Sequence, residues 1–270
     1  MNTRSDIHLP QRIVCTTTES VDILYRLGAG DLIVGVSGFT TRPPEARRKP
    51  KIGAYTSVNL EKILALEPDL VVAFSDLQAD ITRDLVKAGL TVFTLNQRSL
   101  RGILEAILML GSLIGRSAAA QQLVDEMSAE IDGIRQAADR LAKHPRVYFE
   151  EWHEPLIAGI AWVGELIELA GGIDVFPELK GNSAKERVVT ADEVLRRNPE
   201  LIVASWCGKK VNKQIIFSRP GWEAIEAIKH KRVYEIKSVD ILQPGPAVLE
   251  GLKQLHQIIQ KDFALVARAL

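Results

Sequence analysis

Cysteine is scarce in this chain. Of 270 residues only Cys15 and Cys207 are cysteines, which is too few for a disulfide framework. Both lie in or directly after apolar, strand-like runs, so we predict two buried free thiols and no bridge between them. The five histidines are scattered, with no H-x-x-x-H pair and no C-x-x-C motif, which argues against a zinc site.

Long apolar runs and a charge excess are also missing. No stretch approaches the length that spans a bilayer, and the N-terminal segment 1–15 has no apolar region typical of a secretion signal. The 34 basic and 34 acidic residues argue against a broad basic surface for nucleic acid. No P-loop, G-x-G-x-x-G or G-x-S-x-G motif occurs, so we name no catalytic and no metal-ligating residue.

The chain does contain an internal repeat. Residues 59–74 (NLEKILALEPDLVVAF) and 190–205 (TADEVLRRNPELIVAS) align without a gap at an offset of 131 residues. Each copy has the pattern of a short helix, a proline, an acidic residue and an apolar strand. A second pair, 21–30 and 163–172, matches at an offset of 142, and both members end in glycine-rich helix C-caps. So long a period indicates two similarly built lobes.

The order of the expected elements predicts the fold class. Strands are expected at 12–18, 32–37, 70–74, 91–95, 146–151, 201–206 and 233–236, with helices between them. This alternation predicts α/β lobes with doubly wound parallel sheets. The proline-free segment 117–141 is rich in strong helix formers and predicts one long helix. We therefore expect an N-terminal lobe at 1–116, a connecting helix at 117–142 and a C-terminal lobe at 143–270.

Taken together, the segment 35–74 (GVSGF to VVAF), the acidic helix around Asp192 and the long helix between them resemble a known family. It comprises the substrate-binding components of bacterial ABC importers with a rigid helical connector. The cobalamin (vitamin B12) subgroup, related to siderophore and haem binders, is the most similar. The resemblance covers nearly the whole chain and implies two α/β lobes with a ligand cleft between them.

The same resemblance implies a function that is not enzymatic. The protein would capture cobalamin or a related corrinoid and deliver it to an ABC permease, the corrinoid being cargo and not a cofactor. We expect a monomer in the periplasm or at the cell surface; the missing signal leaves a cytoplasmic location open.

Three aromatic residues match positions at which the cobalamin binders place cleft aromatics: Phe39, Tyr55 and Phe74. Ligands of parallel α/β sheets bind beyond the carboxyl ends of the strands, where stiff aromatic faces bury a broad corrinoid with little loss of entropy. Core packing is the alternative for Phe74.

Four further candidates come from the second half of the chain: Trp152, His153, Trp162 and Trp206. Trp152 and Trp206 are expected to follow strands and Trp162 to begin a helix, which favours the rim of the lobe, although tryptophan is as often part of a core. His153 either ligates the metal of a corrinoid or haem, or only forms hydrogen bonds. The family's tryptophan before the second acidic helix is missing, since residues 184–189 read AKERVV.

Two polar loops complete the expected ligand site. Thr17 lies where the first strand leads into a helix, and its free amides and hydroxyl suit polar ligand groups, with plain helix capping as the alternative. Gln243 lies in a comparable loop of the second half.

Glu61 and Asp192 occupy equivalent positions of the repeat, each in the first turn of its helix. The resemblance implies that they dock onto arginine pockets of the permease, and Glu193 replaces Asp192 if the alignment slips by one residue. Simple stabilisation of a helix N-terminus is the alternative.

Two other functions stay open. A ferric siderophore or haem binder is favoured if basic residues such as Arg42 or Arg187 face the cleft. A cytosolic corrinoid chaperone or chelatase-like enzyme is favoured if Glu151, His153 and Cys207 converge.

Overall fold

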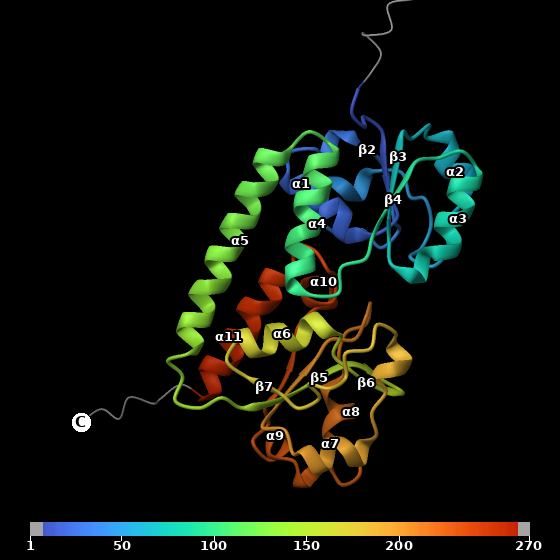
Figure 1. Ribbon diagram of the computed structural model, residues 1–270. Helices are drawn as coiled ribbons and strands as arrows, with labels where there is room; N and C mark the ends of the chain where they lie inside the picture. The colour runs from blue at the N-terminus through green and yellow to red at the C-terminus, as the bar shows by residue number, and fades with distance from the viewer. Residues whose placement is uncertain (1–7, 264–270) are drawn as a thin grey trace, which may run out of the picture. The chain divides into compact units, whose positions relative to one another are not determined.

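The computed structural model describes residues 8–263, which form two compact units (Figure 1). Unit 1 comprises the chain up to Gln97 together with Arg101–Glu126, and unit 2 comprises Arg98–Leu100 and the chain from Met127 onward. Within the described residues, no helix combines the length and the apolar character needed to cross a membrane.

Unit 1 is built on a parallel sheet of four strands in the order β2-β1-β3-β4. Its strands are β1 (Ile13–Cys15), β2 (Ile33–Val36), β3 (Leu70–Phe74) and β4 (Val92–Leu95). The helices in this part of the chain are α1 (Thr18–Arg26), η1 (Gly30–Leu32), η2 (Pro44–Arg48), α2 (Leu60–Ala65), η3 (Asp76–Gln78), α3 (Ala79–Lys87), α4 (Leu100–Leu113) and the first half of α5 (Ser117–Ala138).

The core of unit 1 explains why its short strands are stable. β3 is buried along its whole length, as an apolar strand covered on both faces must be. Under α2 and α3, Ile63 and Leu85 pack against Val14 and Val71 of the two central strands. Where α4 passes the start of α5, a Cβ at Gly111 would lie 2.3 Å from that of Ala120, so this close approach requires glycine.

Unit 2 has a mixed sheet in the order β6-β5-β8-β9, with β7 also paired to β5. Its strands are β5 (Arg146–His153), β6 (Leu156–Ala158), β7 (Ile173–Asp174), β8 (Leu201–Ala204) and β9 (Val233–Glu235). Its helices, besides the second half of α5, are α6 (Ala161–Leu169), η4 (Ala184–Arg187), α7 (Ala191–Arg197), α8 (Lys213–Phe217), η5 (Trp222–Ala224), α9 (Glu226–Lys229), α10 (Ser238–Ile241) and α11 (Val248–Phe263).

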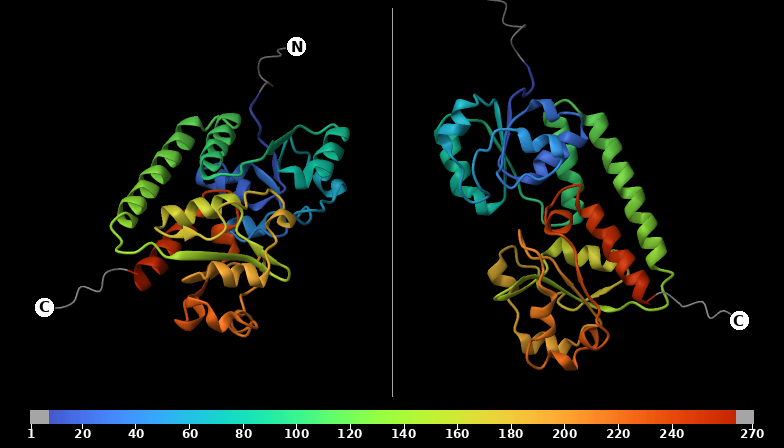
Figure 2. Two further views of the ribbon diagram at one scale, coloured as in Figure 1. Left: turned by 60° about the horizontal axis from the view of Figure 1, so that its bottom comes forward. Right: turned by 180° about the vertical axis from the view of Figure 1, so that it is seen from behind.

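Helix α5 is continuous, and the division between the units lies within it, between Glu126 and Met127. Its second half lies beside α11, as both views of Figure 2 show, and Lys253 Nζ of α11 pairs with Glu130 of α5 at 2.5 Å. The proposed role of this helix as a connector, and the lobe boundaries drawn around it, stay predictions.

The predicted parallel α/β architecture is confirmed, with strand ends within about three residues of the expected ones. Two strands were not predicted: β6, which forms an antiparallel hairpin with β5, and the two-residue β7. The prediction for Cys207 was wrong. Cys15 is buried in β1, whereas Cys207 lies beyond the end of β8 and is exposed.

The repeat corresponds to α2–β3 in unit 1 and α7–β8 in unit 2. The N-cap residues Asn59 and Thr190 each accept a hydrogen bond from a backbone N–H in the first turn. At the other end, Glu67 (φ 46°) and Asn198 (φ 43°) are both left-handed, which turns the chain sharply into the proline.

The acid that both copies of the repeat carry after the proline has a structural role. The carboxylate of Asp69 accepts the backbone N–H groups of Gln11 and Arg12 at 2.7 and 2.9 Å. The carboxylate of Glu200 accepts the backbone N–H of Arg146 at 3.1 Å. In both units the acid therefore attaches the start of one central strand to the start of its neighbour.

The second repeat pair is shifted by one residue from its sequence alignment. α1 ends with Gly28 N–H bonded to Tyr25 O, and α6 ends with Gly171 N–H bonded to Glu168 O. Both glycines have positive φ and close the same type of C-cap. The structural offset is therefore 143 residues, from 28 to 171, because the cap and not the apolar pattern sets the register.

Candidate functional sites

The carboxyl edge of the unit 1 sheet is organised by one buried amide. Gln78 Oε1 accepts hydrogen bonds from Thr16 Oγ1 at 2.6 Å and from the backbone N–H of Phe74 at 3.0 Å. Its Nε2 donates to the backbone carbonyl of Tyr55 at 2.7 Å. Gln78 is completely buried, so this one side chain joins the ends of β1 and β3 to the loop that carries Tyr55.

Ser75, directly after β3, has a strained backbone. Its φ of 63° and ψ of 174° lie in a region that is essentially reserved for glycine. Its N–H donates to Leu95 O at 2.7 Å, and its carbonyl accepts from the Gln78 N–H at 3.2 Å. Such strain costs on the order of 1–3 kcal/mol, and it often marks a functional site.

The three aromatic candidates of unit 1 differ in exposure. Phe39, in the loop after β2, is 61% exposed, Tyr55 is half-buried, and Phe74 is 3% exposed. Phe39 and Tyr55 therefore offer surface to a ligand, whereas Phe74 packs mainly into the unit.

Thr17 is buried and does not cap α1 with its side chain. Its hydroxyl donates instead to Glu19 Oε1 at 2.5 Å. Burial raises the pKa of the Glu19 carboxyl from 4.5 to about 7, although the hydrogen bonds from Thr17 and from backbone N–H groups act in the opposite direction. The loop after β1 thus contains a buried acid that sequence reasoning did not single out.

The carboxyl edge of the unit 2 sheet is held by ion pairs. Glu150 of β5 is completely buried and pairs through both carboxylate oxygens with Arg219, at 2.5 and 2.9 Å. The same carboxylate accepts the indole N–H of Trp206 at 3.1 Å. Trp206, 3% exposed, is thereby fixed in position directly after β8.

An aromatic stack lies against this pair. The His153 ring stacks on Trp206, with centroids 4.1 Å apart and planes inclined by 22°. The ring of Trp152, the preceding residue in the sequence, has its centroid 5.0 Å from that of His153. Lys209 Nζ lies 5.3 Å from the Trp152 centroid. Trp152 and His153 do not follow β5 as expected but belong to it, because the hairpin with β6 extends the strand by two residues.

A second ion pair lies beside the stack. Arg187 is buried, and both of its terminal nitrogens bond Glu151, at 2.5 and 3.0 Å. Desolvation of the sulfur and, to a smaller extent, the charge of Glu151 raise the pKa of the Cys207 thiol, although the residue as a whole is exposed. A raised pKa is the opposite of an activated thiolate.

The two remaining candidates of unit 2 have different surroundings. Trp162 begins α6 as predicted, but it is buried and its indole N–H donates to Ile241 O at 3.0 Å, as in a core residue. Gln243 is half-buried in the loop between α10 and α11.

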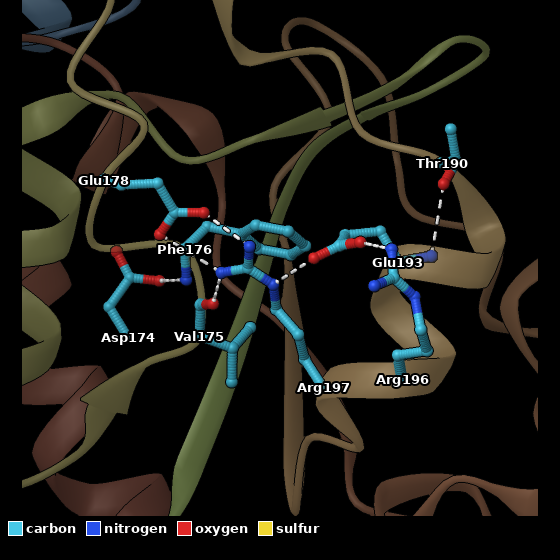
Figure 3. A network of polar contacts seen from close by, with 8 residues as sticks. All are labelled: Asp174, Val175, Phe176, Glu178, Thr190, Glu193, Arg196 and Arg197. Carbon is cyan, nitrogen blue, oxygen red and sulfur yellow. Dashed lines mark hydrogen bonds and ion pairs between the residues drawn. The ribbon is translucent and has the colours of Figure 1, made fainter.

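The three docking candidates lie in the first turns of α2 and α7. Figure 3 shows that the Glu193 carboxylate is already paired with Arg196 and with Arg197, the latter at 2.7 Å. Arg197 in turn binds Glu178 and stacks on Phe176, its guanidinium carbon 4.1 Å from the ring centroid. Glu61 and Asp192 are exposed, and among the described residues neither takes part in an ion pair.

Gln78, Glu150 and Arg219 were missed by sequence reasoning. Each is positioned by contacts with residues more than fifty positions away along the chain, such as Thr16, Trp206 and Glu150 itself. One signal was available for Glu150, an acidic residue that follows the apolar run 147–149 within a strand, a pattern typical of a buried polar group with a defined partner.

Residues 13–239 match the family described as "Periplasmic binding protein". Over 263 residues the chain is 30% identical to an uncharacterized ABC transporter substrate-binding lipoprotein of Bacillus subtilis, covering 94% of this chain and 81% of the relative. It is 24% identical over 255 residues to a vitamin B12-binding protein of Vibrio cholerae, covering 91% and 87% respectively.

A solved structure shows the same fold. A periplasmic heme-binding protein from Roseiflexus superposes with a TM-score of 0.81 at 22% identity, covering 93% of this chain and 98% of the other.

The two α/β units and the match along most of the chain define the class: the chain belongs to the periplasmic binding protein family. More particularly, it is the substrate-binding component of an ABC transporter. The family implies a small-molecule ligand and permease partners, its members are periplasmic or lipoproteins, and its homologues are transport proteins and not enzymes.

Proposed function

We propose that this protein binds cobalamin or a related corrinoid at the carboxyl edges of its two sheets and delivers it to an ABC permease. The observation that carries the proposal is the pairing of partly exposed aromatic surface with neutralised charge. Phe39 and Tyr55 offer aromatic surface in unit 1, and Trp152 with His153 offers it in unit 2.

The charges at the unit 2 edge argue against an anionic siderophore. Arg187 and Arg219 are each bound bidentately by a glutamate of β5. A guanidinium already paired in this way is a poor partner for a hydroxamate or carboxylate ligand. A broad ligand buried chiefly by aromatic faces suits the edge better.

Titration with cyanocobalamin, followed by calorimetry and the visible spectrum, tests the proposal. We expect saturable one-to-one binding that Tyr55→Ala weakens by about tenfold or more, since an aromatic contact and its burial contribute on the order of 1–3 kcal/mol. Phe93→Ala, on the edge strand β4, is the matched control and should leave the affinity unchanged. Absence of binding by the unaltered protein would eliminate cobalamin as the ligand.

Haem is the second candidate, and His153 favours it. An imidazole at the end of β5, between two tryptophans, has the chemistry of an axial iron ligand. Titration with haem, and a change of its Soret band in His153→Ala, would distinguish this candidate from the corrinoid.

For docking we propose Glu61 and Asp192, the two exposed acids of the repeat. Glu193 is unsuited because its carboxylate is held by two arginines. In transport assays with the cognate permease, Glu61→Ala and Asp192→Ala should each reduce uptake without changing ligand affinity. Glu193→Ala is the control, and uptake that depends on Glu193 instead would contradict the assignment.

A further inference from the structure

Gln78 occupies a position that links the two aromatic candidates of unit 1. Its Oε1 accepts from the backbone N–H of Phe74, and its Nε2 donates to the carbonyl of Tyr55. A second donor to Oε1 is the hydroxyl of Thr16, whose single proton lies within reach of both Gln78 Oε1 and, at 3.1 Å, Val72 O. One side chain therefore holds the backbone of both residues relative to the end of β1.

The chemistry of the position suits a carboxamide. The site presents two donors and one acceptor to a completely buried side chain. A carboxamide offers an oxygen with two lone pairs and an N–H donor in the same plane, and only a protonated carboxyl offers a comparable set. A buried polar group left without a partner costs about 1–3 kcal/mol, so most replacements would release one of the three segments.

The Tyr55 loop depends on this attachment. Residues 53–58 form a narrow turn in which Gly53 bridges to Val58 and the Ala54 N–H donates to Ser57 O at 2.7 Å. Gly53 has a φ of 139°, and a Cβ there would lie 2.4 Å from Ser57 O. The turn is thus internally defined, and two bonds from outside hold it against the sheet: the Gly38 N–H donates to Gly53 O at 2.8 Å, and Gln78 Nε2 donates to Tyr55 O.

We infer that Gln78 is a positioning residue for ligand binding: through the Tyr55 carbonyl it holds the Tyr55 ring in the orientation that the ligand contacts. The inference rests on the proposed function for the ligand, but its structural part concerns the loop alone. The strained Ser75, whose carbonyl accepts the Gln78 N–H, lies in the same turn and strengthens the assignment.

The loop is tested without any ligand. In protein labelled with 3-fluorotyrosine, the fluorine signal of Tyr55 is assigned by its loss in Tyr55→Phe. Gln78→Met, similar in size but without the polar groups, should shift or broaden that signal and leave those of Tyr25, Tyr148 and Tyr234 in place. Gln122→Met, on the exposed face of α5, is the control and should change none of them.

Affinity is tested with cyanocobalamin as the probe. Gln78→Met should weaken binding by about tenfold, the equivalent of one lost hydrogen bond, while Gln122→Met should not. If the unaltered protein fails to bind cyanocobalamin, the proposed ligand is wrong, and the fluorine signal still decides the role of Gln78. An unchanged Tyr55 signal in Gln78→Met would overturn the inference.

Gln78→Glu separates positioning from folding, and it serves if Gln78→Met does not fold. Its protonated carboxyl can donate to Tyr55 O and accept from Thr16 and Phe74, whereas the carboxylate loses the donor. The Tyr55 signal should match that of the unaltered protein at low pH and depart from it as pH rises. Because Glu19 also titrates in unit 1, the two proteins are compared at each pH. An identical Tyr55 signal across the range would contradict the role of the donor.

Discussion

The two units share a scaffold and differ in how they hold the carboxyl edges of their sheets. In both, an acid of the repeat joins the two central strands, through Asp69 in unit 1 and Glu200 in unit 2. At the opposite edge, unit 1 relies on the neutral side chain of Gln78, whereas unit 2 relies on the ion pairs of Glu150 and Glu151.

The difference shows which parts of a duplicated fold are free to change. The strand starts must stay paired for the sheet to form, so the acid is present in both copies. The carboxyl edges carry the candidate binding residues of each unit, and it is there that the two units differ. The hydrogen bonds of Gln78 do not depend on pH, because an amide does not titrate. In unit 2, the buried pair of Glu150 and Arg219 holds the Trp206 ring through its indole N–H.

The largest effect is expected from breaking the central ion pair of unit 2. Arg219→Met leaves the completely buried Glu150 carboxylate without its cation, which should destabilise unit 2 by about 3–5 kcal/mol. All four tryptophans belong to unit 2, so denaturation followed by tryptophan fluorescence reports on this unit.

Two variants control that experiment. Arg135→Met removes the exposed pair with Asp132 and should have little effect. Combining Arg219→Met with Glu150→Gln should restore part of the lost stability, because no buried charge remains. A single variant no less stable than Arg135→Met would mean that the pair is not needed at this edge.

The stability of unit 1 should depend on pH through the buried carboxyl of Glu19. The pKa of Glu19 is about 7 in the folded protein and 4.5 for an ordinary glutamate, so the folded state holds the extra proton between these values. The contribution of Glu19 to stability is therefore fully present below pH 4.5 and is lost as pH rises through 7. At pH 8, Glu19→Gln should be more stable than the unaltered protein by up to about 3 kcal/mol, and at pH 4.5 the two should be equal.

Chemical denaturation followed by circular dichroism between pH 4.5 and pH 8 measures this difference. Glu61→Gln, at an exposed first-turn position of α2, is the matched control and should leave the pH profile unchanged. A Glu19→Gln profile that parallels that of the unaltered protein would show that Glu19 is not the titrating group.

The smallest expected effect concerns Glu67 and Asn198, the two residues of the repeat with a left-handed backbone. Glu67→Gly should stabilise unit 1 by about 0.5–1 kcal/mol, since relief of the left-handed backbone exceeds the entropy cost of glycine. Asn198→Gly should instead cost about 1 kcal/mol, because Asn198 Oδ1 accepts the Glu226 N–H. Denaturant midpoints of both variants test the contrast, and equal changes in the two units would refute it.

Much of the scaffold was predictable because its determinants are local. The apolar run of β3, the caps Asn59 and Thr190, and the glycine-rich end of α1 act over a few residues, and each leaves a pattern in the chain. Because the repeat aligns the two halves of the chain, an element recognised in one half predicted the same element in the other. The acid in the first turn of α2 and of α7 was placed correctly in this way.

The candidate site was predictable only in part. Phe39 and Tyr55 lie in loops, as the sequence predicted, but exposure decides which aromatic is available to a ligand, and Trp162 and Phe74 are buried. Whether a tryptophan packs in a core depends on which helix lies over it. The hairpin of β5 and β6, which moved Trp152 into a strand, is likewise a long-range pairing choice.

The amino-acid sequence by itself determined the α/β alternation, the duplicated helix–proline–acid–strand element and the aromatic and acidic residues at its ends, since these follow from short-range preferences. Only the tertiary structure decided which polar groups share a buried network. Gln78 and Thr16 are 62 residues apart, and Arg219 and Glu150 are 69 apart. A hydrogen bond across such a distance needs the completed fold to bring its partners together, and no local pattern in the chain records it.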